Sequence, residues 1–240
     1  VGTGSLTDSL SAIRYHVFEK KNLTMKELLS AVDDNFTDQA ELREMLWKET
    51  PRYGNDDDRA DDEMRRMFEA FFNAVDGRPT ARGGRFRINM LPTTCHVYFG
   101  SVTGAMPDGR RAGLPLSEGI SPVQGTDLNG PTAVLNSAAK MDHVRTGGTL
   151  LNQKFSPQLL ENEKDVEKLV ALVRSYFKMD GHHIQFNVVT AETMRKAQKE
   201  PEKYRNLIVR VAGYSDYFID LSPALQEEII LRTEHADKAV

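Results

Sequence analysis

The residue types in this sequence that could do chemistry are a single cysteine, paired histidines, a run of acids and one glycine inside a strand-like stretch. Cys95 stands directly before His96 in "TTCHVYF", and a cysteine beside a base is the arrangement of an activated thiol nucleophile. The short apolar segment 96–100 is predicted as a strand, in which neighbouring side chains point to opposite faces. Cys95 and His96 are therefore not predicted to form a catalytic pair.

The patterns that would bind a metal or a phosphate are weak. His182 and His183 are adjacent in "DGHHIQFNVV", so on a strand their side chains diverge and shared metal ligation is not predicted. The acidic run at 51–63 is predicted as a solvated loop that leads into a helix N-terminus, where carboxylates complement the helix dipole. The loop 107–125 lacks the GxxxxGK[ST] pattern of a phosphate-binding loop. We therefore assign no metal site.

Gly213 lies in "RVAGYSDYF", at positions 210–218. The longer stretch "LIVRVAGYSDYFIDLSPALQEEII" is predicted as a strand, a tight turn centred on Gly213, a second strand, and a helix. That helix has Ser222 as its N-cap and Pro223 at its first position, a favourable start. On these residues alone, Gly213 is a turn glycine.

The same stretch resembles the radical-site motif of the glycyl radical enzymes, which has the form R-V-x-G-[YF]. The segments "GRRAGLPLSEGISPVQG", "GPTAVLNSAAKMDHVRTGGTLLNQKF" and "HHIQFNVVTAETMRKAQKEPEKYRNLIVRVAGY" are also similar to that family, in the same order. The resemblance thus covers essentially the whole chain, and it favours the dehydratase and lyase branch over pyruvate formate-lyase. It implies that Gly213 carries the radical, with Arg210, Tyr214 and Ser215 as the scaffold that holds it.

Glycine suits a stored backbone radical for a physical reason. An α-carbon radical is delocalised over the two flanking amide groups only when the centre is planar, and a side chain opposes that planarity by steric crowding. Glycine has no Cβ, and it also lets the backbone approach a partner closely. The resemblance and the chemistry of the residue therefore agree on Gly213.

The resemblance also implies partners. A separate radical S-adenosylmethionine activase would install the radical after translation, with no cofactor bound, and the radical would oxidise a cysteine to a thiyl radical that attacks the substrate. In the dehydratase and lyase branch that cysteine lies in a Gly-Cys-x-Glu pattern, which this sequence does not contain. The chain also begins "VGTGSLTDSL", without an initiating Met. We therefore expect a C-terminal part of a homodimeric enzyme, inactive without the N-terminal part that carries the cysteine.

The resemblance implies elimination of a leaving group from a small substrate. Isethionate, with C–S cleavage, is the first expectation, because Arg85 and Arg87 share one face of the predicted strand 85–90 and a guanidinium binds oxyanions through paired hydrogen bonds. Arg87 is the candidate substrate-binding residue, and a solvent-facing pair of arginines is the alternative. Other activities stay open, namely choline trimethylamine-lyase and diol, glycerol or hydroxyproline dehydratase. A non-catalytic spare-part glycyl radical subunit is a further alternative.

Composition limits the partners and the compartment. The 240 residues have a formal net charge of −4, without the basic excess that binding to nucleic acid or anionic membranes requires. The longest apolar runs, such as "LVALV" at 169–173, are far shorter than the roughly 20 residues of a membrane-spanning helix. A single cysteine excludes an internal disulfide and suits a reducing compartment. We therefore expect a cytoplasmic protein without nucleic-acid or membrane partners.

The elements that must position these residues change character along the chain. Helical periodicity and two pairs at capping-box spacing, Ser5 with Asp8 and Thr24 with Glu27, predict helices over 5–20, 24–35, 38–49 and 58–76. From Gly77 onwards short apolar runs alternate with turns. They predict strands over 85–90, 96–100, 150–155 and 183–189 and helices near 131–140, 163–178, 191–198 and 223–235. Strands separated by helices favour parallel pairing with crossover connections.

We therefore predict an α/β fold. Its first part, 1–80, is a helical segment around a barrel. The resemblance implies that the second, 81–190, is part of the α/β barrel of a glycyl radical enzyme. The third, 191–240, is implied to be the glycyl radical domain.

Overall fold

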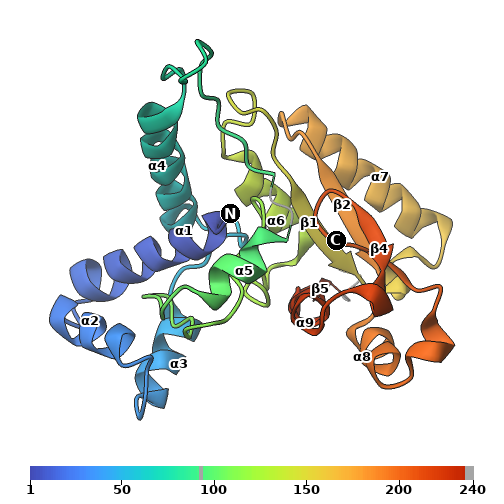
Figure 1. The fold of residues 1–240 in the computed structure, drawn as a ribbon, viewed down its shortest axis with the longest axis horizontal. Coiled ribbons are helices and arrows are strands. Elements are labelled where there is room, and N and C mark those ends of the chain that lie inside the picture. The colour runs from blue at the N-terminus through green and yellow to red at the C-terminus, as the bar shows by residue number, and fades with distance from the viewer. Residues whose placement is uncertain (92–93, 236–240) are drawn as a thin grey trace.

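The computed structural model describes residues 1–91 and 94–235, and its first part is helical (Figure 1). The helices predicted within the first eighty residues are confirmed, and the first of them continues into a π-helix. They are α1 (Thr3–Ala12), η1 (Ile13–Glu19, the π-helix), α2 (Met25–Asp33), α3 (Ala40–Glu49) and α4 (Asp58–Val75). α1 packs against α4, which joins the two ends of this helical part.

One of the two predicted capping boxes forms. The side chain of Thr24 accepts a hydrogen bond from the N–H of Glu27, whose carboxylate accepts one from the N–H of Thr24 at 2.8 Å. The prediction at Ser5 is wrong, because α1 begins directly after Gly2 and Ser5 lies inside the helix. There the Ser5 Oγ accepts from the N–H of Ser117 at 2.9 Å, and the Ser5 N–H donates to the Ser117 Oγ at 3.1 Å. A tertiary contact has replaced the local cap.

A small parallel sheet forms the centre of the α/β part. The strand β1 (Leu151–Phe155) lies between β2 (Ile184–Val188) and the short β5 (Glu234–His235), and both neighbours run parallel to it. Helix α7 (Glu163–Lys178) connects β1 to β2, and it lies on the outer side of the sheet in Figure 1. The predicted strands over 150–155 and 183–189 and their parallel pairing are confirmed.

The remaining elements surround this sheet or follow it. They are α5 (Cys95–Ser101), α6 (Gly130–Ala139), η2 (Pro157–Leu160), α8 (Ala191–Lys199), η3 (Pro201–Tyr204), β3 (Ile208–Arg210), β4 (Ser215–Tyr217), η4 (Phe218–Asp220) and α9 (Pro223–Leu231). The predicted helices near 131–140, 163–178 and 191–198 are confirmed. The predicted helix 223–235 is too long, since α9 ends at Leu231 and the chain then enters β5.

Two predicted strands are wrong. Residues 96–100 lie in α5 instead, and this helix packs so closely on the following loop that a Cβ at Gly100 would lie 2.3 Å from the carbonyl oxygen of Leu114. Residues 85–90 form no regular strand, and only Arg85 and Met90 make isolated bridges there. In both cases short apolar runs matched the strand pattern, and packing that is distant in sequence decided the conformation.

The two faces of the β1–β2 pair differ in polarity. Successive side chains of a strand point to opposite faces, and one face contributes apolar side chains to the main core, namely Leu151, Phe155, Ile184 and Phe186. The other face carries side chains that are polar and nevertheless buried, namely Asn152, Lys154, Gln185 and Asn187. Burial of polar groups is unfavourable unless they are hydrogen-bonded, so this second face must meet polar partners.

Buried apolar side chains gather in three clusters. One lies among α1, α2 and α3, a second joins α4 to the sheet and α7, and a third lies among α8, α9, the strand β3 and η4. Met64 of α4 and Leu151 of β1 thus belong to one cluster. The division into 1–80, 81–190 and 191–240 stays a prediction about organisation.

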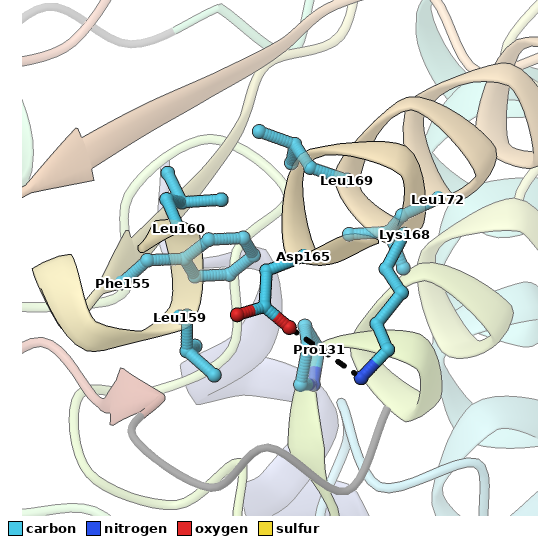
Figure 2. A pocket seen from close by; sticks show the side chains of 8 residues that line it. All are labelled: Pro131, Phe155, Leu159, Leu160, Asp165, Lys168, Leu169 and Leu172. Atoms are coloured by element: carbon cyan, nitrogen blue, oxygen red, sulfur yellow. Dashed lines mark ion pairs between the residues drawn. The ribbon is translucent and has the colours of Figure 1, made fainter. Parts of the chain in front are cut away.

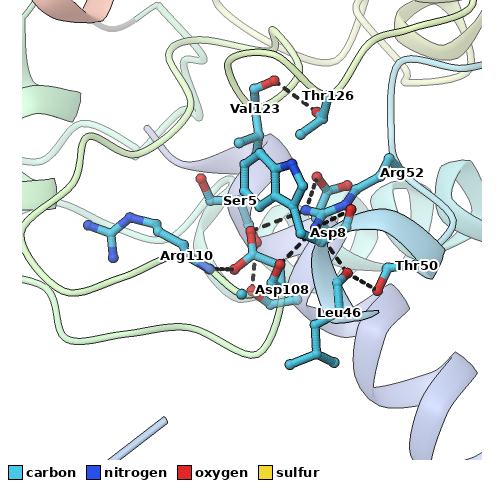
Figure 3. Close-up of polar contacts among 12 residues, drawn as sticks. Ser5, Asp8, Leu46, Thr50, Arg52, Asp108, Arg110, Val123 and Thr126 are labelled. Carbon is cyan, nitrogen blue, oxygen red and sulfur yellow. Dashed lines mark hydrogen bonds and ion pairs between the residues drawn. The ribbon is translucent and has the colours of Figure 1, made fainter. Parts of the chain in front are cut away.

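A buried arginine ties the helical part to the loop that follows α5 (Figure 3). Arg52 lies between two buried carboxylates, with its Nη1 3.1 Å from Asp8 Oδ2 and 3.5 Å from Asp108 Oδ2. Its Nη2 donates to the carbonyl oxygens of Asp108 at 2.7 Å and of Leu46 at 3.1 Å. One side chain therefore connects α1, the end of α3 and the loop at 106–112.

This cluster should take up a proton, because one guanidinium faces two carboxylates. Burial raises the pKa of Asp8 to about 7, with Arg52 opposing the shift and Asp108 adding to it. An aspartate in the unfolded chain has a pKa of about 3.9. The folded chain therefore binds the Asp8 proton more tightly than the unfolded chain does. The stability that protonated Asp8 contributes falls as the pH rises through about 7.

We expect Asp8→Asn, which cannot ionise, to gain stability relative to the wild type between about pH 5 and about pH 8. Denaturant unfolding of both proteins at the two pH values measures this difference. A difference in free energy of unfolding that stays constant with pH would contradict the assignment.

Candidate functional site: the glycine hairpin

Gly213 lies at the tip of a short hairpin. Strands β3 and β4 pair antiparallel with Arg210 opposite Ser215, and the N–H of Val211 donates to the carbonyl oxygen of Tyr214 at 2.9 Å. The predicted order of strand, glycine turn and strand is confirmed. The helix that follows begins as predicted, with the Ser222 side chain capping α9.

The backbone conformation at Gly213 favours glycine, whereas the space around it does not demand it. Its φ is +82°, in the left-handed region that other L-residues rarely adopt. Of the residues that the structure describes, a Cβ built at this position would meet only Leu150 Cδ1, at 3.6 Å, which is an ordinary contact. Val211 and Ala212 before it are buried, whereas Gly213 itself is exposed. Gly213 therefore lies at the tip of a loop whose preceding residues are fixed.

The predicted scaffold residues come together around this turn. The Arg210 guanidinium donates to Ser215 Oγ at 3.0 Å through Nη1, and so bridges the two strands of the hairpin. Tyr214 contributes its carbonyl oxygen to the turn, while its side chain is 38% exposed. Burial raises the pKa of the Tyr214 phenol, and the Asp216 carboxylate adds to that shift. Arg210 and Ser215 are thus joined across the hairpin by their side chains, whereas Tyr214 contributes its backbone.

Two buried amides that the sequence reading missed hold Arg210. Gln185 Oε1 accepts two hydrogen bonds from the guanidinium, from Nε at 3.1 Å and from Nη2 at 2.8 Å. Asn187 Oδ1 accepts from the backbone N–H of Arg210 at 2.7 Å, and its Nδ2 donates to the Arg210 carbonyl oxygen at 2.8 Å. The signal was the polar alternation at 185 and 187 between apolar neighbours, which places both amides on one face of β2.

A second set of buried groups lies beneath the hairpin. Asn152 Nδ2 donates to the Val211 carbonyl oxygen at 3.3 Å and to Glu118 Oε1 at 2.6 Å. Asn152 Oδ1 in turn accepts from the Gln185 amide. Burial raises the pKa of Glu118, and the Arg232 guanidinium opposes this shift. The polar face of the β1–β2 pair is therefore hydrogen-bonded to the hairpin through side chains of both strands.

Helix α9 supplies a buried ion pair to the same region. Arg232 Nη2 donates to Glu228 Oε2 at 2.8 Å and Nε donates to Oε1 at 3.1 Å, while Nη1 lies 3.4 Å from the Arg210 carbonyl oxygen. Burial alone would raise the pKa of Glu228, but Arg232 and His96 outweigh it and hold that pKa well below its usual range. The carboxylate therefore stays ionised and keeps Arg232 directed at the hairpin.

Cys95 and His96 both lie in α5 and not on the strand that the sequence pattern predicted. His96 is fully buried, and its Nε2 lies 3.3 Å from Glu228 Oε2. Cys95 is half-buried. His96 thus joins α5 to the ion pair on α9, which is a role that the sequence reading did not predict.

Arg87 lies in the segment between α4 and α5. Its side chain is 74% exposed, and its Nη1 lies 3.1 Å from Asp76 Oδ2. Arg85 donates to the Gly77 carbonyl oxygen at 2.8 Å. Substrate binding by Arg87 stays a prediction, since this ion pair leaves most of the guanidinium available.

The apolar pocket in Figure 2 is not a substrate site. It lies between α6, β1, η2 and α7 and encloses about 20 Å³, a volume that holds about one water molecule. Leu159, Leu169 and Leu172 line it, and Asp165 and Lys168 form an ion pair at 3.7 Å beside them. The pocket is therefore a packing gap beside the sheet.

Within residues 1–91 and 94–235, no group of three His, Cys, Asp or Glu side chains is arranged to hold a metal ion. Nor does any helix there combine the length and the apolar character needed to cross a bilayer.

Known proteins similar to this chain share both its sequence and its fold. The family model described as "Glycine radical" matches residues 116–219, and the one described as "Pyruvate formate lyase-like" matches residues 1–100. Trans-4-hydroxy-L-proline dehydratase of Clostridioides difficile is 56% identical over 98% of this chain and 30% of its own length. Isethionate sulfite-lyase of Bilophila wadsworthia is 45% identical over 98% of this chain and 29% of its own length.

Solved structures agree with these matches. The substrate-bound hydroxyproline dehydratase of Clostridioides difficile superimposes with a TM-score of 0.96, at 56% identity, over 99% of this chain and 30% of that one. The B12-independent glycerol dehydratase of Clostridium butyricum gives 0.94 at 43% identity, over 98% of this chain and 30% of that one. The chain spans about 30% of the length of these relatives. The predicted α/β fold is confirmed, and the chain belongs to the glycyl radical enzymes.

Proposed function

We propose that Gly213 stores the backbone radical of a glycyl radical lyase or dehydratase. The observation that carries this proposal is the glycine at φ +82° on a hairpin held by Arg210, at the position where the sequence resembles the radical motif. A hydrogen atom would leave the Gly213 α-carbon to the radical of a separate S-adenosylmethionine activase. The remaining electron would be delocalised over the flanking amides, because glycine allows the centre to become planar.

The rest of the reaction would use groups outside this chain. The glycyl radical would take a hydrogen atom from a cysteine thiol in a Gly-Cys-x-Glu loop, and the thiyl radical would take one from the substrate. The substrate radical would then lose its leaving group and recover a hydrogen atom from the thiol, so that no net oxidant is needed. We propose that this chain is the radical-storing part, in a cytoplasmic homodimer, and that it does not turn over substrate alone.

For the substrate we propose elimination of water from a hydroxyl-bearing molecule of the trans-4-hydroxy-L-proline type. The support is the 56% identity to trans-4-hydroxy-L-proline dehydratase, against 45% to isethionate sulfite-lyase. Isethionate is the second candidate, with the exposed Arg87 as its sulfonate ligand. The third candidate is a non-catalytic spare-part subunit. Such a subunit would carry the radical, but no full-length form of it would turn over substrate.

We expect the activated full-length enzyme to dehydrate trans-4-hydroxy-L-proline. Parallel assays would follow sulfite from isethionate, trimethylamine from choline and aldehyde from a diol, with Gly213→Ala as the inactive control. Sulfite release alone would contradict the dehydratase proposal and favour isethionate. If isethionate is the substrate, Arg87→Ala should raise the KM for isethionate. Unchanged kinetics would show that Arg87 does not bind it.

A further inference from the structure

We infer that Asn187 and Gln185 are positioning residues that set the orientation of the glycyl loop, an inference that rests on the proposed radical role of Gly213. Both side chains come from the same face of β2 and are almost completely buried, at 4% and 5% exposure. Both are directed at Arg210, three residues before Gly213. Neither touches the glycine itself, so any effect they have on the radical acts through the loop.

Asn187 takes the place of a neighbouring strand for a single residue. Its oxygen accepts the Arg210 N–H at 2.7 Å and its nitrogen donates to the Arg210 carbonyl oxygen at 2.8 Å. This is the pair of bonds that a strand partner would make, supplied here by a side chain. The amide satisfies both backbone groups and fixes the plane of the chain as it leaves β3.

Gln185 holds the side chain of Arg210. Its oxygen accepts both the Nε and the Nη2 of Arg210, whose Nη1 reaches Ser215 on β4. Hydrogen bonds to a charged donor are the stronger kind. The two amides therefore hold the backbone and the side chain of Arg210 independently, and the guanidinium passes the constraint across the hairpin.

Beyond Arg210 the chain has little freedom before it reaches the glycine. The Val211 carbonyl oxygen accepts from the Asn152 amide at 3.3 Å, and the Val211 N–H donates to the Tyr214 carbonyl oxygen at 2.9 Å. Both Val211 and Ala212 are buried. A fixed Arg210 thus determines where the Gly213 α-carbon lies. Hydrogen-atom transfer between fixed groups depends steeply on their alignment, and a misplacement of about 1 Å can cost about 100-fold in rate.

Asn187→Asp tests this inference with the smallest change in shape. The carboxylate can still accept the Arg210 N–H, but it cannot donate to the Arg210 carbonyl oxygen, and it places two oxygens against each other. Asn55→Asp is the matched control, because Asn55 also bridges backbone groups, donating to the Thr126 carbonyl oxygen at 2.9 Å and accepting from the Leu128 N–H at 2.7 Å. None of the hydrogen bonds of Asn55 involves the hairpin.

The experiment uses activated full-length enzyme and divides turnover of trans-4-hydroxy-L-proline by the number of radical spins measured by electron paramagnetic resonance. We expect Asn187→Asp to lower turnover per spin at least about tenfold, which is about 1.4 kcal/mol of barrier, and Asn55→Asp to leave it unchanged. Turnover per spin in Asn187→Asp within about twofold of the wild type, a barrier change of only about 0.4 kcal/mol, would overturn the inference and leave these amides a structural role.

If Asn187→Asp fails to fold or to accept the radical, Gln185→Ala decides by the same criterion. It removes the guanidinium acceptor and leaves the backbone pairing of Asn187 intact, so a drop in turnover per spin supports the inference and an unchanged value overturns it. The wild-type measurement separates this inference from the proposed function. A wild-type enzyme without a radical on Gly213 overturns both, whereas a wild-type radical with unaffected variants overturns only the positioning role.

Discussion

Replacement of Gly213 by alanine is expected to abolish the organic radical signal that the activated full-length enzyme shows in electron paramagnetic resonance. Among the described residues of this chain, a Cβ at this position would meet only Leu150, at 3.6 Å, so the substitution creates no clash with them. The left-handed backbone should cost the variant about 1–2 kcal/mol of stability, which leaves the fold intact. Loss of the signal would therefore come from the chemistry of the α-carbon and not from unfolding.

Gly83→Ala is the matched control for this prediction. Gly83 has a φ of +80°, and a Cβ there would meet nothing within 4 Å, so the backbone penalty should equal that at Gly213. We expect this control to retain the full signal per protein. A normal signal in Gly213→Ala would remove Gly213 as the radical residue.

Arg52→Ala is expected to have the largest effect on stability, a loss of about 3–5 kcal/mol. The guanidinium is 6% exposed and lies between the fully buried carboxylates of Asp8 and Asp108. Its removal takes away the guanidinium that lies between these two buried acids and leaves the carbonyl oxygens of Leu46 and Asp108 without their Arg52 donor. Since these groups come from α1, α3 and the loop after α5, all three should loosen together.

Native-state hydrogen exchange of α1 and α3 in the full-length protein would measure this loss as a fall in local opening free energy. Arg59→Ala is the control, because the Arg59 side chain is 58% exposed in its ion pair with Asp57, and exposed pairs contribute about 0–1 kcal/mol. Equal effects of the two substitutions would contradict the assigned role of Arg52.

The sequence was informative where the deciding interactions are local. The long helices of the first part, the parallel strands on either side of α7, and the hairpin around Gly213 follow from periodicity, capping and turn residues. The family motif added the chemistry of Gly213 and the choice of Arg210 and Ser215, which do meet across the hairpin.

Other features could not be predicted because they depend on partners that are distant in the chain. The strand pattern of 96–100 gave way to a helix whose Gly100 packs on the loop at Leu114. The role of the Gln185 and Asn187 amides was not predicted, since nothing local in the sequence shows that they bind Arg210. The Arg52 cluster joins residues 44 and 56 positions apart, beyond any periodic pattern.

The central claim is that the radical is stored on Gly213, and exposure of the activated enzyme to air tests it most directly. Oxygen adds to a backbone α-carbon radical and cleaves the chain there, so the site can be read by mass spectrometry of the fragments. We predict a break at Gly213 that appears as the radical signal decays and is absent from Gly213→Ala. A radical that decays while the chain stays intact, or a break at another residue, would contradict the account.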